Sequence, residues 1–283
     1  MKLHRGFGFG DTSEFDPFLL FDDFRNDRPQ DYLRGFPWHP HRGIETITYV
    51  LAGSVDHGDS LGNEGSLGAG DVQWMTAGSG IIHQEMPHGD VQGRMHGFQL
   101  WANLPASLKM TAPRYQDVAA REIPTVTDDD GTHVRVVCGE FWGRRGPVEG
   151  IAADPQYLDV WVPPNHRKTL PVEVTRHAFA YVFEGSGTFR DASGPRPLKV
   201  DDTGDVDNAV YNDARDRSLV LFDRGDQVTV QAGEQGIRFL LVSGRPIEEP
   251  VAWYGPIVMN TEAELRQAFQ EFRNGTFIRQ RGR

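Results

Sequence analysis

Short apolar runs rich in β-branched and aromatic residues recur along the chain, and turn-forming residues separate them. Residues 44–51 form one such run, which ends at Gly53, and a Gly70-Asp71 turn leads into the next run at residues 72–75. The 32 glycines and 18 prolines are scattered along the sequence, as expected for the turns between many short strands. The pattern therefore predicts an all-β fold.

One segment near the C-terminus has helical spacing. Thr261 and Glu264 have the arrangement of a capping box, in which two side chains satisfy backbone N–H groups in the first turn of a helix. Apolar residues then recur at helical spacing before Gly275: Leu265, Ala268, Phe269 and Phe272. We expect a short C-terminal helix whose apolar stripe packs against a barrel.

Two strand-and-turn fragments of the first half resemble segments of the second half in sequence. The matching segments are 49–53 with 181–185 and 70–72 with 225–227. Polar turns between residues 125 and 150 are typical of a domain boundary. The sequence therefore predicts two tandem barrels, residues 1–135 and residues 136–283, with the helix in the second.

The candidate chemistry lies in two short motifs beside predicted strands, His39-Pro40-His41 and His83-Gln84-Glu85. Residues i and i+2 of a strand point to the same face, so each pair can direct both side chains at one point inside a barrel. Imidazoles with a carboxylate suit Fe(II), Mn, Ni, Co or Cu better than calcium or magnesium. An octahedral ion with these four ligands keeps two positions for substrate and dioxygen, which is a catalytic arrangement.

An accidental cluster of histidines is the alternative interpretation. Six of the ten histidines lie between His39 and His96, and close spacing alone is a weak signal. The strand pattern beside each pair favours the metal site. The corresponding positions of the second half hold Pro171, Glu173, Arg238 and Leu240. We therefore expect metal only in the first barrel.

Around these motifs the sequence resembles the cupin superfamily and, more narrowly, the pirin family. The resemblance begins near Phe18, reaches the C-terminal region, and rests on four strings in the same order and spacing. They are HPHRGIET at 39–46, TAGSGIIHQE at 76–85, QLWANLP at 99–105 and KMTAPRYQ at 109–116. The resemblance implies two tandem cupin-type β-barrels of the jelly-roll kind, a bicupin.

The pirin resemblance also implies a site. The family's iron ligands fall on His39, His41, His83 and Glu85, whereas Glu45, which stands at the ligand position of many other cupins, is not expected to bind metal. One divalent transition metal is expected, with Fe(II) the leading candidate and Ni, Co, Mn, Cu and Zn as alternatives.

Three functions follow from the resemblance. Some pirins are quercetin 2,3-dioxygenases, which open the heterocycle of a flavonol with dioxygen and release carbon monoxide. In that interpretation a flavonol or catechol-like substrate binds the metal, and Glu85 is either a general base or a permanent ligand. Other pirins are iron-dependent, redox-sensing protein partners of transcription factors. A metal-dependent isomerase or another small-molecule cupin would share the same ligands.

Composition limits the partners and the compartment. No apolar run approaches the roughly 20 residues that cross a bilayer, and no signal peptide is recognisable, so we expect a cytoplasmic protein without membrane contact. The single cysteine, Cys138, excludes an intramolecular disulfide and fits a reducing compartment. The 29 basic and 40 acidic residues give a net charge of −11, which opposes direct binding to nucleic acid.

The charge leads to a prediction about DNA. Purified protein should show no salt-sensitive binding to random duplex DNA near physiological ionic strength, because an acidic surface repels phosphates. Fluorescence anisotropy of a labelled duplex over a salt series would measure this. Micromolar binding that weakens steeply with added salt would contradict the prediction.

Overall fold

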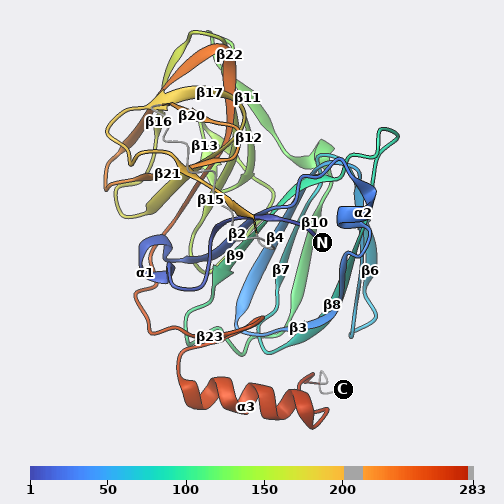
Figure 1. Cartoon of the computed structure of the whole chain (residues 1–283). Helices are drawn as coiled ribbons and strands as arrows, with labels where there is room; N and C mark the ends of the chain where they lie inside the picture. Colours follow the sequence, from blue (N-terminus) through green and yellow to red (C-terminus); the bar gives the residue numbers. More distant parts are fainter. Residues whose placement is uncertain (201–212, 280–283) are drawn as a thin grey trace. The chain divides into compact units, whose positions relative to one another are not determined.

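A computed structural model of the chain describes residues 1–200 and 213–279, without the side chains of Lys199 and Val200 (Figure 1). The chain forms two compact units. The first unit contains Met1–Leu3, Phe7–Ala120 and, among the described residues, 247–279. The second unit contains His4–Gly6 and Arg121–Pro246.

Two antiparallel sheets and a returning hairpin make up the first unit. One sheet has the strand order β10-β7-β4-β9-β2, the other the order β3-β8-β5-β6, and β23 pairs with β24. The strands are β2 (Phe18–Asp23), β3 (Phe36–His41), β4 (Ile44–Ala52), β5 (Ser54–Asp59), β6 (Glu64–Leu67), β7 (Val72–Thr76), β8 (Ile81–His88), β9 (His96–Asn103), β10 (Arg114–Val118), β23 (Ala252–Tyr254) and β24 (Ile257–Met259). The helices are α1 (Thr12–Phe15), α2 (Pro29–Tyr32), α3 (Glu262–Arg273) and the 3₁₀ turn η1 (Ala120–Glu122), which ends in the second unit.

The second unit is built on a sheet of order β11-β12-β15-β22-β17-β21-β18, with β16 paired to β22 and β20 to β17. Two further antiparallel pairs are β13 with β14 and β1 with β19, and the last residue of β1, Phe7, lies in the first unit. The strands are β1 (His4–Phe7), β11 (Thr125–Thr127), β12 (His133–Cys138), β13 (Glu140–Phe141), β14 (Arg144–Arg145), β15 (Gln156–Val162), β16 (Arg167–Pro171), β17 (His177–Phe189), β18 (Arg196–Pro197), β19 (Lys199–Val200), β20 (Ala214–Arg215), β21 (Ser218–Phe222) and β22 (Gln227–Gly244).

The predicted all-β class is confirmed, and so is the C-terminal helix. Thr261 caps α3, with its hydroxyl accepting from the backbone N–H of Glu264 while the Glu264 side chain accepts from Thr261. Leu265 and Ala268 of the predicted stripe are buried, whereas Phe272 is 40% exposed. No helix among the described residues is long and apolar enough to span a membrane.

The structure divides the chain differently from the predicted 1–135 and 136–283. Residues 121–135 belong to the second unit, because β11 pairs with β12 and β12 pairs with β15. Residues 247–279 return to the first unit, where α3 packs with the β23–β24 hairpin and with Ile82 of β8. The sequence placed this helix in the second barrel because chain order gives no sign of the return.

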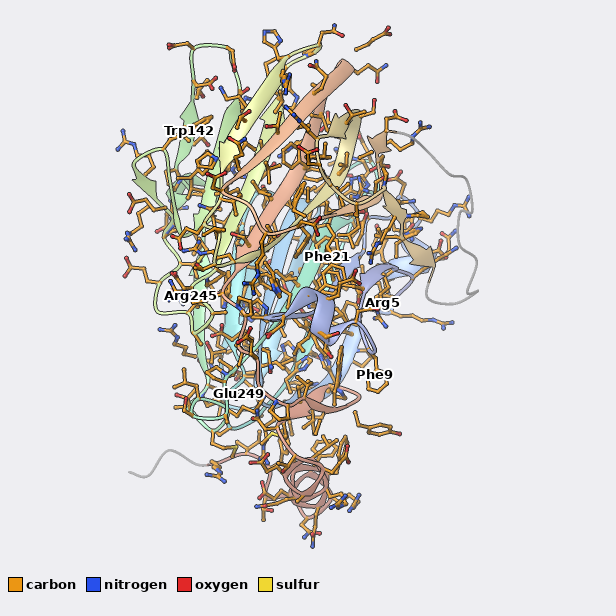
Figure 2. The ribbon with its side chains drawn as sticks, turned by 90° about the vertical axis from the view of Figure 1, so that its left-hand side faces the viewer. Arg5, Phe9, Phe21, Trp142, Arg245 and Glu249 are labelled. Carbon is orange, nitrogen blue, oxygen red and sulfur yellow. The ribbon has the colours of Figure 1, made fainter. Side chains whose placement is uncertain are left out.

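Aromatic and aliphatic side chains fill the core of the first unit. Phe21 of β2, labelled in Figure 2, is fully buried, and its ring centroid lies 5.9 Å from that of Phe98 on β9. Trp74 of β7 and Ile47 of β4 are also fully buried. These inward positions alternate with the residues of the opposite face, as the strand period requires.

Glu45 of β4 is an ionisable group within this apolar interior. Its side chain is 2% exposed, and its Oε1 accepts a 2.6 Å hydrogen bond from the Thr76 hydroxyl. Burial raises the pKa of the Glu45 carboxyl, and the hydrogen bonds it accepts oppose the rise. Folding therefore favours the protonated form of this carboxyl.

Glu45→Gln should raise the free energy of unfolding at neutral pH relative to the native protein and have little such effect near pH 4. A carboxyl with a raised folded-state pKa keeps its proton where the unfolded chain has lost it, so native stability falls as pH rises above about 4.3. Glutamine has no charge to bury. Urea unfolding at both pH values measures the difference, with Glu64→Gln on exposed β6 as the control. Parallel pH profiles for the native protein and Glu45→Gln would contradict the prediction.

Candidate metal centre

Two neighbouring antiparallel strands supply the predicted histidines. His39 and His41 lie on β3, His83 lies on β8, and His39 is the direct cross-strand partner of His83. Cross-strand partners point to the same face, and so do residues i and i+2. The register of β3 and β8 therefore gathers the three imidazoles on one side of the sheet.

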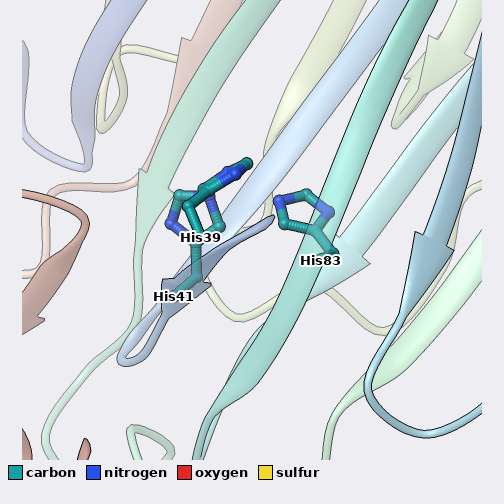
Figure 3. Close-up of side chains that lie close together, drawn as sticks. All are labelled: His39, His41 and His83. Carbon is teal, nitrogen blue, oxygen red and sulfur yellow. The ribbon is translucent and has the colours of Figure 1, made fainter. Parts of the chain in front are cut away.

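The three imidazoles converge on one point (Figure 3). One ring nitrogen from each of His39, His41 and His83 lies within 4.8 Å of the other two, a spacing that can hold a metal ion. His41 and His83 are each 1% exposed, while His39 is partly exposed. The cluster is thus buried on one side and accessible at His39.

Backbone carbonyls fix the tautomer of two rings. The Nδ1 of His39 lies 2.9 Å from the carbonyl oxygen of Pro37, and the Nδ1 of His41 lies 3.1 Å from that of Pro256. Because a carbonyl oxygen only accepts, each Nδ1 carries the proton and donates it. The Nε2 of each neutral ring is then left with a bare lone pair, as in many metal-binding histidines.

The distance between these two Nε2 atoms is 3.0 Å. Two lone pairs at this distance repel unless a cation lies between them. Burial, followed by the neighbouring His83 and His39, holds the pKa of His41 well below its ordinary value, which disfavours a proton as that cation. Two metal–nitrogen bonds of about 2.1 Å at right angles would place their nitrogens about 3.0 Å apart.

His83 completes the donor set. Neither of its ring nitrogens has a hydrogen-bond partner among the described residues, although the side chain is buried. Burial lowers the pKa of His83 to about 4, and the nearby carboxylate of Glu85 opposes this effect. A buried, neutral imidazole without a partner is costly unless a ligand satisfies it. The observed donors therefore fit a divalent transition metal.

Glu85 lies two residues after His83 on β8, so its side chain faces the same interior. The histidine cluster does not include its carboxylate. Glu85 instead accepts hydrogen bonds from Gln99 Nε2 of β9, at 3.1 and 3.3 Å, and from the Thr48 hydroxyl of β4, at 3.2 Å. The indole N–H of Trp101 donates in turn to Gln99 Oε1 at 3.3 Å. The opposite sheet thus holds and orients this carboxylate.

The remaining histidines of the first barrel have other partners. His57 Nε2 lies 3.0 Å from Gln73 Nε2, His88 pairs with Asp56, and His96 pairs with Asp27. In the second unit Arg238 forms an ion pair with Asp159, and Leu240 is part of the core. The part of the chain that the structure describes contains no second group of metal-binding side chains.

Sequence reasoning missed five contributors to the site: the carbonyls of Pro37 and Pro256 and the side chains of Thr48, Gln99 and Trp101. No motif could have identified Pro256, because a backbone carbonyl 215 residues from His41 leaves no mark in the sequence. Thr48 and Gln99 had a weak signal. Each is a polar residue on a largely apolar strand, in positions that proved to be buried.

Comparison with known proteins agrees with this architecture. Residues 1–102 match the Pirin family, and residues 157–278 match the family described as Pirin C-terminal cupin domain. A pirin-like protein of Caulobacter vibrioides is 46% identical over 98% of this chain and 93% of its own length. A pirin-like protein of Solanum lycopersicum is 39% identical over 96% of this chain and 86% of its own.

A solved structure is similar over nearly the whole chain. The crystal structure of quercetin 2,3-dioxygenase from Acinetobacter baumannii has a TM-score of 0.82 and 31% sequence identity, and the match covers 97% of this chain and 91% of that one. The predicted resemblance is therefore confirmed. With two matching family domains, one in each half, this chain belongs to the pirin family.

Proposed function

We propose that this pirin binds one divalent transition metal in its first barrel and is a metal-dependent dioxygenase that cleaves a flavonol such as quercetin. His39, His41, His83 and Glu85 would be the ligands. The observation that carries the proposal is the convergence of three imidazoles, two of them buried, whose ring nitrogens lie within 4.8 Å of one another. The similarity to a quercetin 2,3-dioxygenase at 31% identity supports the choice of reaction.

A bound ion would supply a Lewis acid that lowers the pKa of a substrate hydroxyl and brings the substrate next to dioxygen. Imidazole nitrogens are suited to holding such an ion, and the Nδ1–H bonds to the carbonyls of Pro37 and Pro256 keep the rings of His39 and His41 in one orientation. Fe(II) is our leading candidate for the ion, with Ni, Co, Mn, Cu and Zn as alternatives.

Glu85 is our candidate for the general base. Its carboxylate is buried and accepts hydrogen bonds from Gln99 and Thr48, which fix its orientation. An ionised carboxylate two residues from a ligand can take the hydroxyl proton of a flavonol. Gln99 and Thr48 would hold the base on the substrate side, whether or not Glu85 also binds the metal.

Trp101 offers an apolar surface for an aromatic substrate. Its indole is 9% exposed, and its ring centroid lies 5.0 Å from that of His41 in an edge-to-face arrangement. Aromatic rings favour such contacts by about 1 kcal/mol beyond their burial. A flavonol near this wall would be shielded from water while its oxygen atoms face the imidazoles.

His41→Ala should abolish stoichiometric metal binding without unfolding the protein. The change removes one of the facing Nε2 atoms, and two imidazoles retain an ion much less firmly than three. Metal analysis of anaerobically purified protein measures the stoichiometry, and circular dichroism measures folding. His88→Ala, which removes an exposed histidine that pairs with Asp56, is the control. One metal per chain in folded His41→Ala protein would refute the assignment.

Glu85→Gln should lower flavonol turnover per bound metal by about 10²-fold or more, the usual scale for loss of a general base. Glutamine keeps the size of the side chain and can still accept from Gln99 and Thr48. Oxygen uptake and carbon monoxide release with quercetin measure turnover, and Glu64→Gln on β6 is the control.

Near-native turnover by metal-loaded Glu85→Gln would exclude the base role and leave Glu85 as a ligand alone. If the native protein consumes no oxygen with any flavonol or catechol, the dioxygenase proposal fails. The interpretation as an iron-binding, redox-sensing partner of transcription factors would then be favoured.

A further inference from the structure

The segment 247–279 returns from the second unit to the first barrel and contains β23, β24 and α3. We call it the C-terminal strap. Glu249, labelled in Figure 2, lies near its start, and its carboxylate accepts from the backbone N–H of Ala106 and from Asn260 Nδ2. The strap is therefore anchored to the barrel from its first residues.

Three consecutive residues at the end of β3 contact the strap. His41 Nδ1 donates to the carbonyl oxygen of Pro256, and the carbonyl oxygen of Arg42 accepts from the N–H of Val258 at 3.1 Å. At Gly43, which has a φ of +77°, an added Cβ would lie 1.9 Å from the Val258 carbonyl oxygen. Only glycine permits this approach. The strap thus docks directly behind a proposed metal ligand.

Arg42 binds the strap through a buried charge. Its side chain is 2% exposed; Nη1 donates to Glu271 Oε2 at 2.7 Å, and Nη2 donates to the Phe277 carbonyl at 2.9 Å. The guanidinium also lies 4.2 Å from the centroid of the Phe277 ring. Its Nε donates to the carbonyl of Ser79, just before the strand that carries His83. A buried cation is tolerated only with such partners, so Arg42 requires the strap in place.

Lys109 makes a second set of buried hydrogen bonds to the strap and to the barrel. Its ammonium donates to the carbonyl oxygens of Gly43 and Val258, at 2.9 and 3.1 Å, and to Asn103 Oδ1 at 2.7 Å. The side chain is 1% exposed. These bonds join the end of β3 to β24.

The strap also supports His41 from the side. The ring centroid of Trp253 on β23 lies 6.1 Å from that of Trp101, which in turn lies 5.0 Å from that of His41. The imidazole is therefore held by a strap carbonyl at Nδ1 and by a tryptophan that the strap packs against. Both contacts limit rotation of the ring.

We propose that the C-terminal strap is a positioning element for His41, and that strap docking and metal binding are coupled. The Pro256 carbonyl keeps the proton on Nδ1 and so presents Nε2 to the ion, which is the usual effect of a second partner on a ligating histidine. By thermodynamic linkage, an ion that needs this orientation must in turn stabilise the docked strap. The inference rests on the proposed metal site.

Glu271→Gln tests one direction of the coupling. It removes the carboxylate partner of Arg42 without altering a ligand, and Glu262→Gln is a matched control on the same helix, where Glu262 is exposed and its Oε2 lies 4.0 Å from Arg266. With Ni²⁺ as the probe, we expect transfer to a coloured chelator to be about 10-fold faster from Glu271→Gln than from the native protein. The control should release Ni²⁺ within twofold of the native rate.

Hydrogen exchange of the native protein tests the other direction and needs no variant. Ni²⁺ should slow amide exchange in α3 more than in β10, an edge strand of the same unit. General stabilisation of the unit would slow both alike, so the difference reports coupling to the strap.

The outcomes separate the two proposals. A native protein that binds no Ni²⁺ overturns both the metal site and the coupling. Firm native binding, together with a native release rate from Glu271→Gln or equal protection of α3 and β10, overturns the coupling and leaves the metal site intact.

Discussion

The Nε2 atoms of His39 and His41 lie 3.0 Å apart inside the first barrel, and much of the surrounding structure serves to hold them there. Such an arrangement is unfavourable without a cation, so the fold has to enforce it. The register of β3 against β8 sets the distance, the carbonyls of Pro37 and Pro256 set the tautomers, and burial keeps protons away from the buried rings. Bringing the imidazole nitrogens together costs free energy, and a metal ion bound between them would offset that cost.

The two sheets of the first unit contribute different side chains to the site. The sheet containing β3 and β8 carries the imidazoles and Glu85, and the facing sheet supplies Thr48, Gln99 and Trp101. One sheet thus carries the imidazoles and the carboxylate. The other sheet holds the carboxylate by hydrogen bonds and supplies the apolar side chain of Trp101. Two uncharged donors, the Gln99 amide and the Thr48 hydroxyl, fix the orientation of the Glu85 side chain.

Much of this could be predicted from local sequence. The strand period placed His39 with His41 and His83 with Glu85, and the capping box at Thr261 identified α3, because these signals depend on neighbours within a few residues. The partners of Glu85 depend on which strands face each other, and the return of the strap depends on packing between segments far apart in the chain. No local pattern encodes either of these. For the same reason, the predicted boundary after residue 135 separated α3 from the barrel that it covers.

The position of the strap in the chain affects the order in which the first barrel can be completed during synthesis. The ribosome makes His41 early and Pro256 late, and residues 121–246 of the second unit lie between them in the chain. A nascent chain can pair its early strands while it still lacks the carbonyl that orients His41 and the partners of the buried Arg42. The contacts that orient His41 can therefore form only after nearly all of the described chain has been translated, and a prematurely terminated product would lack them.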